Sequence, residues 1–179
     1  MKASIALGNF DGVHKAHGRL IKTLCSLPGE SIVYTFDKHP REMLEKNVKL
    51  LMSPELKEET LLSLGVDKVY FEHLTMKILN MSPENFIKDL LLKRFCVGSI
   101  VAGFNYRFGA KAEGNAETLK ELGKKYGFDV YIADEISVEG KTLSSTLLRN
   151  LLSEGEIEKY NDYSERPYTI RGRVTRGKG

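Results

Sequence analysis

Short apolar runs alternate with amphipathic segments along most of this chain. The runs are rich in β-branched and aromatic residues, as buried strands are, and they cover residues 4–9, 31–36, 67–72, 99–104 and 129–134. The other segments repeat apolar positions at helical spacing, at residues 17–24, 53–65, 82–95, 116–127 and 144–155. Strands that alternate with helices form βαβ units, so we predict an α/β fold built on a doubly wound parallel sheet.

This fold class also predicts where a ligand binds. In open parallel sheets, ligands occupy the crevice beyond the carboxyl ends of the strands, near the point where the strand order reverses. The loops that follow the strands are therefore the segments in which chemistry is to be sought.

Composition narrows the class of protein. The chain has 179 residues, 41% of them hydrophobic, which suffices for one domain and part of a second. It has neither an apolar stretch of about eighteen residues nor a secretory signal, so we expect a cytoplasmic protein with no membrane partner. Mixed charges with a net +3 do not favour a nucleic-acid partner. Cys25 and Cys96 lie in apolar segments, where we expect buried, reduced thiols.

The character of the chain changes after Tyr160. Residues 161–179 carry five lysines and arginines against two acids and show no apolar helical face. They end in the strand-like sequence TIRGRVTRG, which finds no second strand in the remaining residues. This segment is therefore expected to open a second unit, and either to pack on the first domain or to fray.

The stretch GNFDGVHKAH, at residues 8–17, lies where the first strand ends and a helix begins. Free backbone N–H groups and the helix dipole make such a turn a site for anions, phosphate above all. His14 and His17 are three residues apart and can both point ring N–H groups at a phosphate. The stretch has neither the Rossmann nor the P-loop glycine pattern. Metal ligation by the histidines with Asp11 is the weaker alternative.

Three further segments combine polar groups suited to ligands. Ser144, Ser145 and Thr146 begin a helix and precede Arg149 by one turn, an arrangement that suits a polyphosphate or, more simply, an N-cap. The loop at residues 102–115 has three aromatic side chains and Asn105, which could stack and read a flat ring or merely fill the core. Residues 34–43 contain TFDKHP, whose histidine is either functional or structural.

These four motifs, in this order and spacing, closely resemble the adenylyltransferase module of prokaryotic bifunctional FAD synthetases, the riboflavin kinase/FMN adenylyltransferase enzymes. The family pattern is G-x-F-D-G-x-H-x-G-H, a PHP-like step, G-x-[DN]-F-x-F-G and I-S-S-T-x-[IV]-R. Ala16 replaces a glycine of the first motif, Lys38 the first proline of the second, and Leu143 and Leu148 replace Ile or Val in the last. The tail also resembles the opening strand and first glycine-rich loop of the family's kinase barrel.

The resemblance implies a Rossmann-like nucleotidyltransferase fold over residues 1–160, with residues 161–179 as a linker and the first strand of an incomplete riboflavin kinase barrel. It implies transfer of AMP from ATP to FMN, giving FAD and pyrophosphate, with Mg²⁺ held mainly by substrate phosphates and water rather than by a protein metal site. Riboflavin kinase activity is expected to be absent from this chain, and the kinase module to be present in the full-length protein.

The resemblance also assigns residues. The ATP-binding set is Gly8, Asn9, Phe10, Asp11, His14, His17, Ser144, Ser145, Thr146 and Arg149, of which His14, His17 and Arg149 are expected to be catalytic. The flavin-binding set is Phe36, Asp37, Pro40, Phe104, Asn105, Tyr106 and Phe108. Two alternatives stay open: a nucleotidyltransferase of the same superfamily with another phosphorylated acceptor, and a flavin- or nucleotide-binding domain without catalysis.

Overall fold

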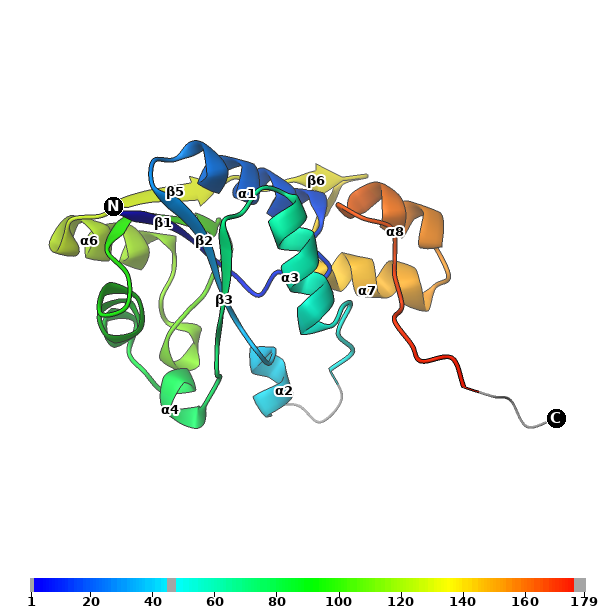
Figure 1. Cartoon of the computed structure of the whole chain (residues 1–179), viewed down its shortest axis with the longest axis horizontal. Helices are drawn as coiled ribbons and strands as arrows, with labels where there is room; N and C mark the ends of the chain where they lie inside the picture. The colour runs from blue at the N-terminus through cyan, green and yellow to red at the C-terminus, as the bar shows by residue number, and fades with distance from the viewer. Residues whose placement is uncertain (1, 45–47, 176–179) are drawn as a thin grey trace.

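The computed structural model describes residues 2–44 and 48–175 of the chain (Figure 1). Five parallel strands form the central sheet in the order β3-β2-β1-β4-β5. They are β1 (Ala3–Leu7), β2 (Glu30–Phe36), β3 (Lys68–Glu72), β4 (Val97–Gly103) and β5 (Asp129–Ala133). The chain winds outward from β1 in both directions, so the strand order reverses between β1 and β4. The predicted doubly wound parallel sheet is therefore confirmed.

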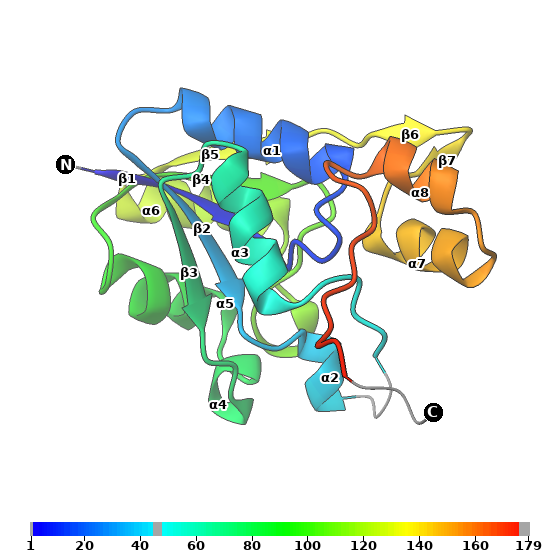
Figure 2. The same cartoon turned by 45° about the vertical axis from the view of Figure 1, so that its right-hand side comes forward.

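Helices cover both faces of this sheet (Figure 2). On one face, α1 (Lys15–Ser26) and α3 (Pro54–Ser63) bury Leu20, Ile21 and Leu61 against the strands. On the other face pack α4 (Met76–Leu79), α5 (Pro83–Asn85), the π-helix η1 (Phe86–Leu92) and α6 (Ala116–Tyr126). Every residue of β1 is buried, as expected for the central strand of a sheet covered on both sides.

Local sequence signals explain several of these helix ends. The Ser53 hydroxyl accepts a hydrogen bond from the Leu56 N–H and Pro54 follows it, as the sequence pattern predicted. Gly127 ends α6 in the left-handed region, with φ of 77°. The segment predicted as one helix from residue 82 begins with the Ser82 cap, but it continues as a π-helix, which the apolar spacing does not distinguish from an α-helix.

The remaining elements surround the end of the sheet at which β1 stops. They are α2 (Pro40–Leu44), the 3₁₀ turn η2 (Ala110–Ala112), the hairpin β6 (Ser137–Val138) and β7 (Lys141–Thr142), α7 (Ser145–Ser153) and α8 (Ile157–Tyr163). A separate apolar cluster joins α7 and α8, with Leu148, Leu151 and Tyr160 buried together. The predicted apolar face of the helix from residue 144 is thus in contact with a helix that the sequence patterns did not predict.

Helix α8 spans residue 160, where the sequence predicts that a linker begins, and residues 164 and 165 bond to the loop after β1. Two expectations from the sequence need correction. Residues 169–175 form no strand in the described part of the chain, because no partner strand lies beside them, and residues 176–179 lie outside it. Cys25 and Cys96 are exposed free thiols, since each falls on the solvent side of its apolar segment.

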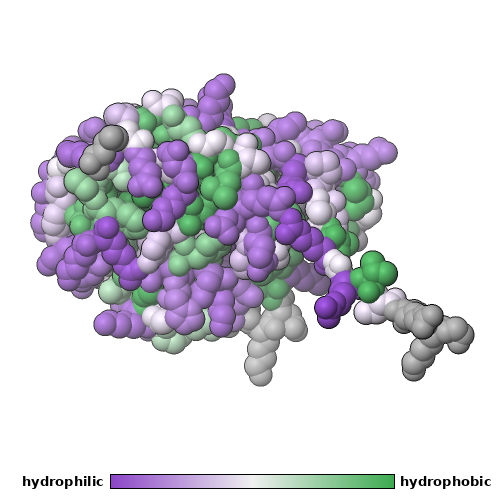
Figure 3. Space-filling view, viewed as in Figure 1, coloured by the Kyte–Doolittle hydropathy of each residue, from purple (hydrophilic) through white to green (hydrophobic). Residues whose placement is uncertain are grey.

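The surface shows no extended apolar area on the face drawn in Figure 3, where hydrophilic side chains surround small hydrophobic areas. Ile170 and Val174, in the segment that leads away from the body of the molecule, are 78% and 99% exposed. Among the described residues, no helix is long and apolar enough to cross a membrane.

Candidate functional site

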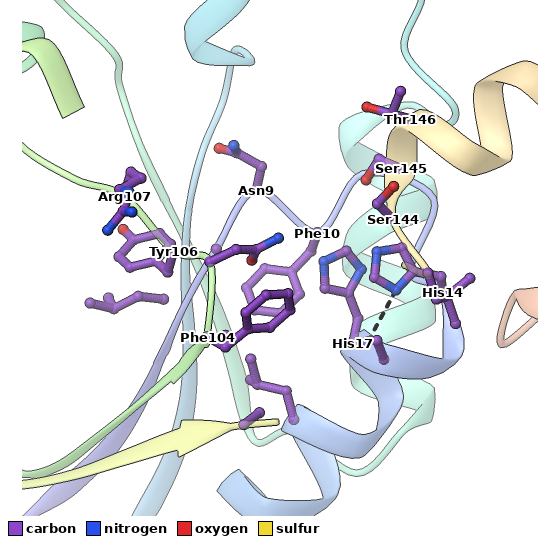
Figure 4. Close-up of a pocket in the computed structure, with 18 of the residues that line it drawn as sticks. Asn9, Phe10, His14, His17, Phe104, Tyr106, Arg107, Ser144, Ser145 and Thr146 are labelled. Atoms are coloured by element: carbon purple, nitrogen blue, oxygen red, sulfur yellow. Dashed lines mark hydrogen bonds between the residues drawn. The ribbon is translucent and has the colours of Figure 1, made fainter. Parts of the chain in front are cut away.

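A cavity of about 540 Å³ opens at the carboxyl ends of β1, β4 and β5, where the strand order reverses (Figure 4). This is the position that parallel-sheet geometry predicts for a ligand. Most of the residues singled out in the sequence line it: Gly8, Asn9, Phe10, His14, His17, Pro40, Phe104, Asn105, Tyr106, Ser144, Ser145, Thr146 and Arg149. The structure thus brings segments more than a hundred residues apart in sequence to one cavity.

The loop from β1 to α1 has an unusual backbone. Phe10, Gly12 and Val13 all have positive φ, of 49°, 81° and 32°. Side chains with a Cβ seldom adopt this region, and such residues persist only where the surroundings hold them. Phe10 is almost fully buried, and its ring lies 2.9 Å from the position that a Cβ on Gly8 would take. Gly8 therefore allows the loop to turn tightly beneath the cavity.

The two histidines form a stacked pair. Their ring centroids lie 3.7 Å apart with an angle of 15° between the planes. His14 is the N-cap of α1, and its Nδ1 accepts a hydrogen bond of 3.3 Å from the backbone N–H of His17. Because Nδ1 accepts, the neutral His14 ring carries its proton on Nε2.

Burial keeps this pair uncharged at neutral pH. Desolvation lowers the pKa of His14 to about 4. Burial also lowers the pKa of His17, and a proton on His14 or the charge of Lys57 lowers it further. Nδ1 of His17 is buried and has no hydrogen-bond partner among the described residues. A buried polar atom without a partner is uncommon in folded proteins, so hydrogen bonds within the described residues do not explain the position of this ring.

At the start of α7, the hydroxyl groups have different tasks. The Ser144 hydroxyl caps the helix by accepting from the Leu147 N–H at 3.2 Å. The Ser145 hydroxyl donates to the Asp11 carbonyl at 2.7 Å and so ties α7 to the loop after β1. The exposed Thr146 hydroxyl bonds to no described residue. The simple N-cap alternative therefore explains Ser144, while the helix N-terminus still faces the cavity and favours an anion there.

Asp11 lies behind the cavity rather than in its wall. Its carboxylate is almost fully buried, accepts from the Leu51 N–H at 2.9 Å and pairs with Arg149 at 2.6 Å. Arg149 also donates to the carbonyl of Lys49 at 2.8 Å, and its side chain lines the cavity. Asp11 therefore holds the Arg149 guanidinium in place, a role that differs from the direct nucleotide contact expected from the sequence.

The residues expected on the flavin side divide into two groups. Pro40, Phe104, Asn105 and Tyr106 line the cavity, and Figure 4 shows Tyr106 across it from the histidines. Phe36, Asp37 and Phe108 lie outside its wall. The two phenylalanines pack in the core, and Asp37 accepts from His73 at 2.6 Å and from the Leu74 N–H at 3.0 Å. For Phe108, filling the core is the alternative that its burial supports.

Several cavity residues were not assigned a role from the sequence. Arg107 and His39 fall inside the quoted motifs, and Ala16 lies at the point where the family pattern has glycine. Asp134 and Ile136 follow β5, and the rule that ligands bind at the carboxyl ends of strands would have pointed to them. Asp134 is the sole carboxylate among the described residues of the cavity wall, where Arg107 and Arg149 supply positive charge.

The side chains of the cavity do not form a metal-binding site by themselves. No group of three or more His, Cys, Asp or Glu side chains suited to a metal occurs in residues 2–44 and 48–175. A divalent cation in this cavity would need most of its ligands from a substrate and from water, as Mg²⁺ commonly does at nucleotide phosphates.

The sheet order and the cavity at its switch point place the chain in the class of doubly wound α/β proteins that bind a ligand at this position. A family model described as FAD synthetase matches residues 1–147, so the chain belongs to the FAD synthetase family. The family resemblance inferred from the motifs is thereby confirmed.

Named relatives agree with this family. The bifunctional riboflavin kinase/FMN adenylyltransferase of Listeria monocytogenes is 37% identical over 180 residues, which cover 97% of this chain and 57% of the relative. The protein of the same name from Buchnera aphidicola (subsp. Schizaphis graminum) is 31% identical over 182 residues, covering 98% and 58%. The chain therefore spans a little over half the length of these curated relatives.

Solved structures show the same fold. A crystal structure described as a macrolide-efflux protein from Streptococcus pneumoniae matches with a TM-score of 0.82 and 26% identity, over 93% of this chain and 56% of that one. The pantoate-beta-alanine ligase of Francisella tularensis matches with a TM-score of 0.55 and 17% identity, over 90% and 77%. The second likeness shows the fold alone.

Proposed function

We propose that this chain is an FMN adenylyltransferase, which transfers AMP from ATP to the phosphate of FMN. A phosphate oxygen of FMN attacks the α-phosphorus of ATP, the bond from that phosphorus to the bridging oxygen breaks, and pyrophosphate leaves. The observation that carries the proposal is that the stacked pair of His14 and His17 and the N-terminus of α7 line one cavity. The family and the names of the relatives support FMN and ATP as the substrates.

The reaction needs alignment and charge neutralisation more than acid–base chemistry. The attacking phosphate is already an anion, so no general base is required. His14 would donate its Nε2 proton to an ATP phosphate, and the ring of His17, which also lines the cavity, would contact the phosphates beside it. Arg149, held by Asp11, and the helix N-terminus at Ser145 and Thr146 would stabilise the leaving pyrophosphate.

Mg²⁺ would neutralise charge on the phosphates of ATP and would be held by them and by water. Asn105, Phe104, Tyr106 and Pro40 would contact the flavin from the opposite wall. A cavity of about 540 Å³ is within the usual range for small-molecule sites, roughly 300–1,000 Å³. We also propose that the protein is cytoplasmic.

Riboflavin kinase activity is not part of the proposal for these residues. The relatives carry it in their names, and the chain spans 57% of the first of them. We propose, in line with the sequence prediction, that residues 1–160 form the adenylyltransferase domain and that a kinase module follows them in the full-length protein.

The acceptor is tested by comparing substrates. The chain is incubated with ATP and Mg²⁺ and, in parallel, with FMN, riboflavin, nicotinamide mononucleotide or phosphopantetheine, while pyrophosphate release is followed. Of these acceptors, only FMN is predicted to cause pyrophosphate release. Riboflavin is predicted to remain unphosphorylated. Faster release with another phosphorylated acceptor would favour the alternative nucleotidyltransferase, and ATP binding without any release would favour a binding domain.

A further inference from the structure

The residues that follow α8 still contact the loop that carries His14. Residues 164–168, here called the strap, run from the end of α8 past the start of α1 and on along α3 (Figure 2). Ser164 forms an antiparallel bridge with His14, and the Glu165 N–H donates to the Val13 carbonyl at 3.0 Å. The strap therefore bonds directly to the backbone that carries the first histidine.

The other side of the strap is anchored to two helices. Ser164 is buried, and its N–H donates to the Tyr160 carbonyl in α8 at 3.0 Å. Arg166 reaches the buried Thr60 hydroxyl in α3 at 3.2 Å. Asn161 accepts from the Tyr168 N–H at 2.8 Å. These bonds make the strap a bridge between α3, α8 and the loop after β1.

The loop needs such support because of its backbone. Val13 is β-branched, fully buried and has a φ of 32°, a conformation that the chain adopts only where the surroundings fix it. A hydrogen bond to the Val13 carbonyl fixes the peptide plane between Val13 and His14. That plane in turn sets the direction of the His14 side chain, which caps α1 and stacks on His17.

We propose that the strap positions the histidine pair for catalysis, and that Glu165, through its backbone N–H, is a positioning residue of the active site. Only the catalytic part of this inference rests on the proposed function. The contacts that hold the histidine pair in place involve no substrate. It implies that the residues just beyond the domain proposed for residues 1–160, expected from the sequence to be a linker, support the active site of that domain.

The test removes the single N–H group. Glu165→Pro deletes the donor to Val13, and the extended backbone of Ser164, with φ of −100° and ψ of 161°, tolerates a following proline. Glu165→Ala keeps the donor. Ile170→Pro is the matched control, because Ile170 is 78% exposed and lies beyond the strap.

We expect Glu165→Pro to lower kcat about tenfold while the KM for FMN changes by less than about twofold, since small misplacements of reacting groups cost mainly turnover. Glu165→Ala should recover the lost turnover, and Ile170→Pro should behave as wild type. Amide exchange at His17 and Gly18, which bond to His14, should accelerate in Glu165→Pro while the amides of β4 keep their rates.

Unchanged turnover and exchange in a folded Glu165→Pro variant would overturn the proposal, as would equal losses in Ile170→Pro or faster exchange throughout the sheet. If Glu165→Pro fails to fold, Arg166→Met removes the anchor on Thr60, and a kcat loss of about threefold with faster exchange at His17 is expected. No change in that variant would also overturn it. A wild-type chain that makes no FAD would instead refute the proposed function, while the exchange experiment would still test the strap.

Discussion

The stacked histidines show how burial sets the chemistry of single residues. His14 caps α1 through Nδ1, so its remaining ring proton is fixed on Nε2, whereas Nδ1 of His17 has no described partner. His17→Ala removes this ring from the cavity, and we expect kcat to fall about a hundredfold with little change in FMN affinity, because the role proposed for His17 is at the ATP phosphates. Steady-state kinetics and FMN titration measure the two effects separately.

The control for this variant is His73→Ala, an exposed histidine outside the cavity wall, which should leave turnover unchanged. Equal losses of turnover and FMN affinity in His17→Ala would contradict the assignment.

The lowered pKa of His14 predicts a pH-dependent stability. Its pKa is about 4 in the folded chain and about 6.5 when unfolded. Between these values the unfolded chain binds a proton at this position that the folded chain does not. The contribution of neutral His14 to the free energy of unfolding is therefore fully present above about pH 6.5 and is lost as pH falls toward 4. The loss in the free energy of unfolding amounts to about 3 kcal/mol. Urea unfolding from pH 7 to 4 measures it, and His14→Gln should flatten the curve; an unchanged slope would refute the attribution.

Asn105 tests the proposed flavin side of the cavity. Its side chain is exposed in the loop after β4, next to Phe104 and Tyr106. Asn105→Ala should weaken FMN binding about tenfold and ATP binding much less. The variant removes a polar side chain that is proposed to hydrogen-bond the flavin, and this loss lowers the affinity for FMN but not for ATP. Isothermal titration with each substrate gives both affinities. A larger loss for ATP would place this loop on the nucleotide side.

The positions of the cavity residues were predicted best where one motif contains the neighbouring residues. The histidines and the helix start at Ser144 were found because their spacing alone brings them onto one turn. The role of Asp11 was not, since its partners Leu51 and Arg149 are 40 and 138 residues away. Phe36 and Phe108 look like stacking residues in sequence, and only packing shows that they face the core.

At the scale of elements, the Asp11–Arg149 pair joins the loop after β1 to α7. Its side chains are 3% and 19% exposed, and breaking a buried pair costs more than a surface one. We expect Asp11→Asn to lower the free energy of unfolding by about 2–3 kcal/mol and to reduce kcat/KM for ATP, because Arg149 loses its anchor. Denaturant unfolding and kinetics test both.

Asp129→Asn is the matched control for this variant. Asp129 is an exposed carboxylate at the start of β5 and makes no ion pair with described residues. It should leave stability and activity unchanged. A stable Asp11→Asn variant with normal ATP kinetics would show that Arg149 needs no anchor.

The same scale shows why some elements were predictable. Each of the five strands is short, apolar and bounded by turn residues, so its pattern is local. Helix α8 was missed because its burial depends on one main side chain, Tyr160, packed against α7 and Tyr168. The strand expected at residues 169–175 requires a partner that these residues do not supply.

For the whole molecule, the order β3-β2-β1-β4-β5 fixes where the cavity lies. Loops from distant parts of the chain meet beyond β1 and β4, and the histidines, the start of α7 and the loop proposed to contact the flavin line the cavity there together. Sequence motifs identified many of the residues that line this cavity, and the parallel sheet explains why they meet. The contribution of the strap was not predictable, because it depends on backbone hydrogen bonds that any residue except proline can make.

The most direct test of the account follows the α-phosphate itself. The chain is incubated with Mg²⁺, FMN and ATP labelled at the α-phosphorus, and the products are separated. The account predicts that the label moves into FAD with release of an equal amount of pyrophosphate, and that His17→Ala lowers this transfer. Label recovered as AMP, or in no product despite bound ATP, would contradict the claim that this cavity transfers AMP to FMN.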